Sequence, residues 1–241
     1  MIKTIALICC RGGSKGIPGK NIKHFHGKPL LNWIIESAKE SSVFDEIFLS
    51  TDSSEIAEIG RGLGISIPGL RPSTLAADDS DQFDTHKYLF EHLKIKDDSH
   101  FVCNLNNNPF ISSEIIRAGF HIAHENKFEN IVLDYVEVAS DYKYFRQSIN
   151  NGKNFVSLFP LNLLESNINR QSAFATYSAI NNMRWAKPSH LISYENFKME
   201  IIRNGYFGVK LPKMRNFDLD DLEDWEIAEA VMGKLVESSK V

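Results

Sequence analysis

Strand-like and helix-like segments alternate along roughly the first 135 residues, and this alternation limits the possible folds more than any other feature of the chain. The strand-like runs are KTIALICC, EIFLSTD, FVCNL and NIVLDYVEV, and the helix-like segments between them are PLLNWIIESAKES, SSEIAEIGRGLG, QFDTHKYLFEHLK and SSEIIRAGFHIAHEN. Such alternation predicts right-handed βαβ crossovers and an α/β fold with a mostly parallel sheet. Ligands of such sheets bind beyond the carboxyl ends of the strands. We therefore expect the turns that follow the strands to meet at one cavity.

Length, charge and cysteine usage narrow the class of protein. The 241 residues fit a single domain spanning 1–241, and the net charge of -4 argues against a nucleic-acid binder. No CxxC pair occurs among the three cysteines, so neither a disulfide framework nor a zinc site is indicated. Because no apolar run has the length of a membrane span and no signal peptide is recognisable, we expect no membrane partner and a cytoplasmic location.

A glycine-rich, basic loop follows the first predicted strand, in the stretch ICCRGGSKGIPGKN at residues 8–21. Glycines allow backbone N–H groups to form an anion-binding concavity, and Arg11, Lys15 and Lys20 add cationic side chains. A Walker A loop and a dinucleotide fingerprint both require glycine at position 14, where this chain has Ser14. Three cations exceed the need of a monophosphate, so we expect a triphosphate whose pyrophosphate leaves.

The stretch from about 138 to 190 has a different composition from the preceding segments. It is rich in Asn, Tyr and Phe, and Asn151-Gly152 between two extended segments indicates a hairpin turn. We interpret it as a flap or dimerisation insertion. After it, the chain is expected to close with a helix whose apolar stripe is Trp225, Ala228, Val231, Met232 and Leu235.

Two acidic residues near the C-terminus, Asp218 and Asp220, are two positions apart. In an extended segment their carboxylates lie on the same face and repel each other unless a cation intervenes. Mg²⁺ binds one or two carboxylates and completes its octahedron with phosphate oxygens and water. The alternative is a helix N-terminus, where acidic residues favour the helix dipole.

The opening RGGSKGIPGKNIKHFHGKPLLNW resembles that of the cytidylyltransferases that activate acidic sugars, namely the acylneuraminate enzymes and the related 3-deoxy-octulosonate enzymes. Further similar segments are FDEIFLSTDSSEIAEIGRGLG, LRPSTLAADDS, NRQSAF and FDLDDLEDWEIAE. The resemblance implies a Rossmann-like three-layer αβα nucleotidyltransferase fold with a small dimerisation insertion. It also implies that the triphosphate of CTP is held by Arg11, Gly12, Gly13, Ser14, Lys15, Gly16, Lys20 and Asn21.

The reaction that this resemblance implies is attack of a sugar hydroxyl on the α-phosphorus of CTP, giving a CMP-sugar and pyrophosphate. Catalysis of this kind depends on positioning and charge neutralisation. Arg11, Lys15 and Lys20 would stabilise the leaving pyrophosphate, and Mg²⁺ on Asp218 and Asp220 would bridge phosphate oxygens. The acidic sugar would meet Arg71, Asn106, Asn107, Arg170 and Gln171, and the enzyme would be a homodimer.

Two stretches depart from the family pattern and leave alternatives open. The third strand ends in NLNNNPFIS, which lacks the usual arginine after the proline, and Ser178 replaces a usual glycine. Both changes fall where the sugar or the cytosine is expected. The acceptor is therefore open among sialic, legionaminic and pseudaminic acids, 3-deoxy-octulosonate and other acidic acceptors. A non-catalytic CTP-binding paralogue, and a glycosyltransferase with an Asp-x-Asp metal site, are the other interpretations.

Overall fold

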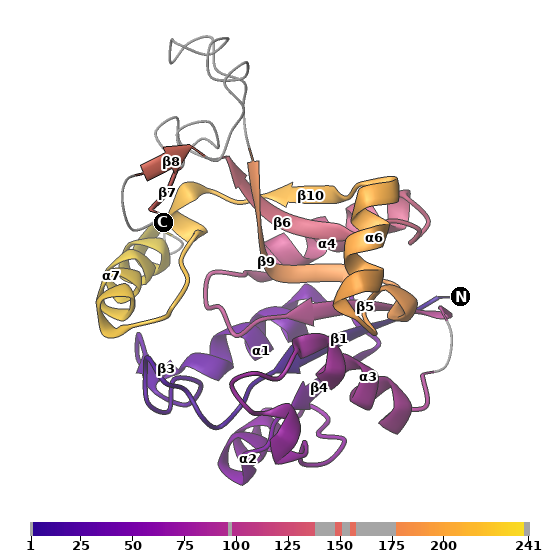
Figure 1. Cartoon of the computed structure of the whole chain (residues 1–241). Helices are drawn as coiled ribbons and strands as arrows, with labels where there is room; N and C mark the ends of the chain where they lie inside the picture. The colour runs from indigo at the N-terminus through magenta and orange to yellow at the C-terminus, as the bar shows by residue number, and fades with distance from the viewer. Residues whose placement is uncertain (1, 96–97, 138–147, 151–154, 158–176, 239–241) are drawn as a thin grey trace.

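The protein is built on a six-stranded sheet, seen in a computed structural model that describes residues 2–95, 98–137, 148–150, 155–157 and 177–238 (Figure 1). The strand order is β10-β6-β9-β5-β1-β4. The strands are β1 (Lys3–Cys9), β4 (Glu46–Ser50), β5 (His100–Leu105), β6 (Val132–Glu137), β9 (Tyr177–Ala186) and β10 (Phe207–Lys210). β9 runs antiparallel to both of its neighbours, β5 and β6, and the other pairings are parallel. The predicted mostly parallel α/β sheet is confirmed.

Helices cover both faces of this sheet, as a three-layer fold requires (Figure 1). On one face lie α1 (Leu30–Ser41), α2 (Ser54–Gly62) and α4 (Ser113–Glu125), and on the other lie α3 (Gln82–His92) and α6 (Tyr194–Asn204). α1 forms where the sequence predicts, because its predicted apolar stripe recurs at helical spacing and is buried, namely Leu30, Leu31, Ile34, Ile35 and Ala38. α2 begins after Ser53, whose side chain accepts a hydrogen bond from the backbone N–H of Ile56 at 3.4 Å.

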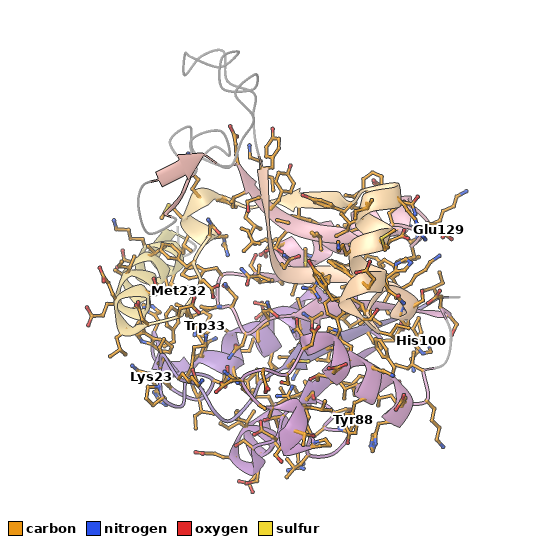
Figure 2. All side chains as sticks on the ribbon, in the orientation of Figure 1. Lys23, Trp33, Tyr88, His100, Glu129 and Met232 are labelled. Atoms are coloured by element: carbon orange, nitrogen blue, oxygen red, sulfur yellow. The ribbon has the colours of Figure 1, made fainter. Side chains whose placement is uncertain are left out.

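The final helix, α7 (Leu222–Ser238), stands beyond the carboxyl edge of the sheet (Figure 1). Its predicted stripe faces inward, with Trp225, Ala228 and Met232 buried against Phe25 and Phe110. Figure 2 shows Met232 beside Trp33 of α1. Because Ile17 of the glycine loop is fully buried in the same cluster, α7 and this loop are held together at the edge where the strands end.

Small elements complete the described chain. They are the pairs β2 (His24–Phe25) with β3 (Lys28–Pro29) and β7 (Ser148–Asn150) with β8 (Phe155–Ser157), and the 3-10 turns η1 (Ser73–Leu75), η4 (Pro188–His190) and η5 (Lys213–Arg215). β7 and β8 pair antiparallel on either side of the predicted hairpin turn, although Asn151 and Gly152 themselves lie outside the described residues. The predicted insertion at 138–190 includes β9, which belongs to the central sheet. Most of the rest of that stretch is not described, so the insertion stays a prediction.

Candidate active site

The glycine loop between β1 and β2 is fixed by its own turns and by one buried side chain. Ile17 is fully buried, and its carbonyl accepts a hydrogen bond from the backbone N–H of Lys20 at 3.1 Å. Gly19 has a φ of 64°, a left-handed conformation that favours glycine, and its carbonyl accepts from the N–H groups of Ile22 and Lys23. The loop is therefore an ordered turn that places Lys20 and Asn21 at the carboxyl end of β1.

Hydrogen bonds connect this loop to the ends of two neighbouring strands. The backbone N–H of Gly12 donates to Asp52 at 2.9 Å, and Asp52 follows β4. The side chain of Asn21 donates to the carbonyl of Arg11 at 2.7 Å and accepts from Asn107, just after β5, at 2.8 Å. The turns after β1, β4 and β5 thus meet, as the expected sheet predicts.

A cavity of about 380 Å³ lies at this meeting point. Its lining combines cationic, amide and acidic side chains with a few apolar ones. Of the predicted site residues it includes Arg11, Lys20, Asn21, Arg71, Asn106, Asn107 and Asp218. Seven residues from segments that are distant in the sequence therefore line one cavity. Their individual roles remain predictions.

Two cations of the loop already have an anionic partner. Arg11 and Lys15 both bind the carboxylate of Asp78, at 2.8 and 2.6 Å. These hydrogen bonds hold the pKa of Asp78 below its usual value, because they favour the charged carboxylate. A polyphosphate that binds Arg11 and Lys15 would therefore have to displace the carboxylate of Asp78.

Lys20 links the loop to the acidic segment before α7. Its ammonium donates to the backbone carbonyl of Leu219 at 2.7 Å. Leu219 is buried, whereas Asp218 and Asp220 on either side are exposed, so the two acids alternate away from the core as the extended-segment prediction requires. Asp218 lines the cavity. The backbone oxygen of Asp220 lies so close to Gly16 that a Cβ on this glycine would be 1.7 Å away.

The donor set of this segment suits Mg²⁺. One oxygen of Asp218 accepts from the N–H of Leu219 at 3.0 Å, which leaves the second oxygen for another partner. Among the described residues no group of three His, Cys, Asp or Glu side chains could hold a metal by itself. A magnesium ion that takes one or two carboxylates and fills its shell with phosphate oxygens needs no such group. The acids therefore fit a metal that arrives with a nucleotide.

The alternative role of the acids, at a helix N-terminus, falls mainly to the next residues. The carboxylate of Asp224 accepts from the N–H groups of Asp220 and Asp221 at 3.1 and 3.3 Å. Asp221 in turn accepts from the N–H of Asp224 at 2.9 Å. Because Asp221 and Asp224 cap the start of α7, the carboxylate of Asp218 is not needed for that purpose.

Arg71 enters the cavity from the segment after α2. Its side chain is 6% exposed and lies 3.9 Å from the carboxylate of Asp52. One guanidinium nitrogen donates to Thr85 at 3.4 Å, and its buried Nε has no partner among the described residues. A buried, unpaired donor in a cavity wall favours an oxygen acceptor on the ligand.

A cysteine, Cys9, also lines the cavity, and its environment disfavours the thiolate. Burial raises the pKa of Cys9 to about 11, although Arg71 and Arg184 lower it in part. The thiol is therefore protonated at neutral pH, and the thiolate needed for covalent catalysis is scarce. This agrees with a reaction that needs no covalent intermediate.

The remaining predicted residues are less central, and some lie outside the description. Gly12 forms the hydrogen bond to Asp52, and Gly16 packs on Asp220, whereas Gly13 is exposed and Ser14 is half-buried. Asp220 is not among the residues that line the cavity. Arg170 and Gln171 lie outside the described residues, so the structure does not test them.

Several cavity residues were not predicted as site residues from the sequence. They are Gln82, Thr85, Asn108 and Asn182, together with Ser80. Asn108 could have been inferred as the third member of the NNN run. Asp78, which the resemblance of the LRPSTLAADDS segment places near the substrate, also lines the cavity. Gln82 and Asn182 had no comparable signal, because a polar residue at the edge of a helix or strand is normally solvated.

Comparison of the sequence with known proteins identifies a family and several relatives. A sequence model of the family described as "Cytidylyltransferase" matches residues 5–226. The pseudaminic acid cytidylyltransferase of Campylobacter jejuni is 34% identical over 131 residues, covering 53% of this chain and 56% of that protein. The CMP-N,N'-diacetyllegionaminic acid synthase of Legionella pneumophila is 37% identical over 124 residues, covering 50% of this chain and 53% of that protein. The matched part thus spans about half the length of these relatives.

A solved structure shows the same fold over nearly the full chain. CMP:2-keto-3-deoxy-manno-octonic acid synthetase complexed with CTP superposes with a TM-score of 0.71, covering 96% of this chain and 99% of that one. The sequence identity is 15%, so this likeness concerns the fold alone. It confirms the expected nucleotidyltransferase-like architecture.

Proposed function

The chain belongs to the cytidylyltransferase family, and from this premise we propose that it transfers CMP from CTP to an acidic sugar of the nonulosonic acid class, releasing pyrophosphate. The observation that carries the proposal is the single cavity shared by the basic glycine loop, the amide-rich end of β5 and Asp218. The cavity offers cations for a triphosphate, amides for a polar sugar and a carboxylate for a metal ion. The named relatives act on pseudaminic and diacetyllegionaminic acids.

In this proposal the loop neutralises the pyrophosphate. Arg11 and Lys15 exchange Asp78 for phosphate oxygens, and Lys20, already at the cavity wall, supplies a third positive charge. Each well-placed donor to the developing charge is worth about 3 kcal/mol, or roughly a hundredfold in rate. This exchange takes place when CTP binds, so the three cations would already contact the phosphates when charge develops on the leaving pyrophosphate.

The acceptor hydroxyl needs alignment with the α-phosphorus. Arg71 and the amides of Asn106 and Asn107 line the cavity beside the loop and would hold the sugar. Alignment of this kind replaces a covalent nucleophile. Asp218, with Asp220, would hold Mg²⁺, which supplies charge neutralisation on the phosphates when bound.

We further propose a homodimeric enzyme that works in the cytoplasm, where its CTP is made. Within the described residues no helix combines the length and the apolar character needed to cross a bilayer. The three cysteines are free, and Cys10 and Cys103 are buried in the core. Sedimentation of the purified protein tests the dimer.

The direct test is pyrophosphate release from CTP with Mg²⁺ and a panel of acidic sugars. The panel holds sialic, legionaminic, pseudaminic and 3-deoxy-octulosonic acids, and ATP, GTP and UTP serve as nucleotide controls. We expect release with CTP and at least one nonulosonic acid. CTP binding without release for any sugar would support a non-catalytic paralogue, and absence of CTP binding would refute the proposal.

A matched pair of lysine variants separates the cavity from general charge. Lys20→Ala should lower kcat by about a hundredfold. Lys23→Ala removes the same charge from a neighbouring position, but its ammonium lies 4.7 Å from the Trp225 ring rather than in the cavity. This control should stay near wild type, and an equal loss in both variants would contradict the assignment of Lys20.

A further inference from the structure

A polar hydrogen-bond network connects the cavity lining to the protein interior, and it consists of Gln82, His86, Asn104 and Asn106. It joins α3, which covers one face of the sheet (Figure 1), to the end of β5. His86 and Asn104 are fully buried, whereas Gln82 and Asn106 line the cavity. His86 Nε2 lies 2.9 Å from Asn104 Oδ1. The side chains of Gln82 and His86 meet the same partner because they are one helical turn apart.

The hydrogen bonds of this network have a defined direction. Asn104 Nδ2 donates to Asn106 Oδ1 at 3.3 Å, so the oxygen of Asn104 faces His86. An oxygen can only accept, and His86 Nε2 must therefore carry the hydrogen. His86 Nδ1 is then the unprotonated nitrogen; it makes no hydrogen bond of normal geometry among the described residues, although the backbone carbonyl of Leu191 also acts on the ring.

Burial keeps the imidazole neutral. It lowers the pKa of His86 to about 4, because a charged ring would lose its hydration. A neutral ring has one donor and one acceptor nitrogen, so the donor at Nε2 is maintained at neutral pH. The histidine therefore presents a permanent donor to Asn104.

The same hydrogen bonds fix the orientation of the Gln82 amide. Its Nε2 donates to the oxygens of both Asn104 and Asn106, at 3.3 and 3.2 Å. Asn106 uses its own amide N–H to donate to the carbonyl of Asn181 at 3.0 Å. Both amide atoms of Asn104 and of Asn106 thus have a protein partner, with one N–H of Asn106 Nδ2 left over, whereas Gln82 Oε1 makes no hydrogen bond within the described chain.

Unused groups of both kinds therefore line this cavity. Gln82 Oε1 is an acceptor, and two buried donors, Nδ2 of Asn182 and Nε of Arg71, lack partners among the described residues. Asn182 is 8% exposed, so water satisfies it poorly. Unpaired buried polar groups are costly unless a ligand completes them.

We propose that Gln82 accepts a hydrogen bond from the acceptor sugar, and that His86 and Asn104 are positioning residues that hold Gln82 in the orientation this contact needs. The ligand group that Gln82 meets is a neutral hydrogen-bond donor, an O–H or an amide N–H. A neighbouring oxygen of the ligand accepts a hydrogen bond from Nδ2 of Asn182. The inference rests on the proposed function, since it assigns this wall to the sugar and the loop side to CTP. If His86 lost its donor, the amide orientations of Asn104 and Gln82 would be held only by their hydrogen bonds to each other and to Asn106.

The test compares two variants of His86. His86→Gln keeps an N–H near the position of Nε2, whereas His86→Met fills similar volume without a donor. We expect His86→Met to raise KM for the sugar about three- to tenfold, the order expected for one misplaced neutral hydrogen bond, with kcat and KM for CTP unchanged. His86→Gln should remain near wild type. Thermal unfolding of both variants verifies that each folds.

A double-variant cycle tests whether His86 acts through Gln82. Gln82→Met should raise KM for the sugar by a similar factor, and adding His86→Met should cause no further increase. Additive effects, equal effects of Gln and Met at position 86, or a parallel rise in KM for CTP would overturn the inference.

Two measurements keep this inference separate from the proposed function. Nitrogen-15 spectra of the histidines should show a neutral His86 ring protonated at Nε2, and protonation at Nδ1 would overturn the inference whatever the enzyme does. Calorimetric binding of each sugar, with CTP present, reports the effect even without turnover. If wild type neither binds nor converts any acidic sugar, the proposed function fails and the inference fails with it.

The source of the donor is distinguished by the substrates. Sugars that carry an N-acylamino group can be compared with analogues that carry only hydrogen in its place at the same carbon. If the amide N–H is the donor, Gln82→Met raises KM for the N-acylated sugar only. If a hydroxyl is the donor, the variant affects both sugars equally.

Discussion

Gly16→Ala tests whether the basic loop and the acidic segment must touch. The added Cβ would lie 1.7 Å from the backbone oxygen of Asp220 and 3.0 Å from its carbonyl carbon. Ordinary carbon-to-oxygen contacts are about 3.3 Å, so one of the two segments must move by roughly 1.6 Å. Both neighbours are backbone, which cannot rotate away as a flexible side chain could.

The displacement affects activity more than folding. Overpacking of this kind typically costs about 1–3 kcal/mol of stability. A shift of about 1 Å in a positioned group typically costs roughly a hundredfold in rate. The hydrogen bond from Lys20 to the carbonyl of Leu219, at 2.7 Å, would also be strained. We therefore expect Gly16→Ala to lower kcat/KM about a hundredfold and to weaken the response to Mg²⁺.

Gly62→Ala is the matched control. Gly62 lies in α2, outside the predicted CTP-binding loop, and a Cβ there would meet nothing within 4 Å. Pyrophosphate release at several Mg²⁺ concentrations, with thermal unfolding of both variants, gives the comparison. Wild-type kcat/KM in Gly16→Ala would refute the reasoning, because the close approach would then have no functional consequence.

Three further predictions follow from the charged groups of the site. Asp78→Asn frees Arg11 and Lys15 and should tighten CTP binding about two- to fivefold by calorimetry, since exposed ion pairs are individually weak; unchanged affinity would contradict the competition. Asp218→Asn should raise the Mg²⁺ concentration for half-maximal turnover about tenfold or more. Asp221→Asn, at the start of α7, is its control. Burial lowers the pKa of His86 in the folded protein to about 4, from its ordinary value of 6.5, so the neutral ring costs no stability above pH 6.5, and stability falls as pH falls from 6.5 towards 4. Urea unfolding should show about 3 kcal/mol of this loss in wild type and none of it in His86→Met.

The sequence predicted those parts of the fold whose signal is local. α1 and α7 formed as expected because their apolar residues recur at helical spacing and become buried. β9 was not predicted as a central strand, since the segment YSAINNMRWA shows no alternating pattern. Its partners in β5 lie about eighty residues earlier, and only the assembled sheet brings them together.

The same distinction applies to the site. Arg11 and Lys20 were predictable because glycines and cations after a first strand have a physical reason of their own. Gln82 and His86 were not, because α3 was recognised by its apolar residues, and nothing local indicates that two polar residues of this helix turn inward. Their burial depends on Asn104 in β5, which offers them a partner.

The three asparagines after β5 show how a departure from the family pattern can be structural as well as functional. Asn106 belongs to the buried network, Asn107 binds Asn21 of the basic loop, and Asn108 donates to the carbonyl of Phe217 at 2.8 Å while accepting from the N–H of Phe110 at 2.9 Å. One short run thus joins α3, the glycine loop and the acidic segment. Amides can do this because each has both donors and an acceptor and adds no charge. Because these amides add no charge, they do not compete with Asp78 for Arg11 and Lys15, which in the proposed function pass to the triphosphate.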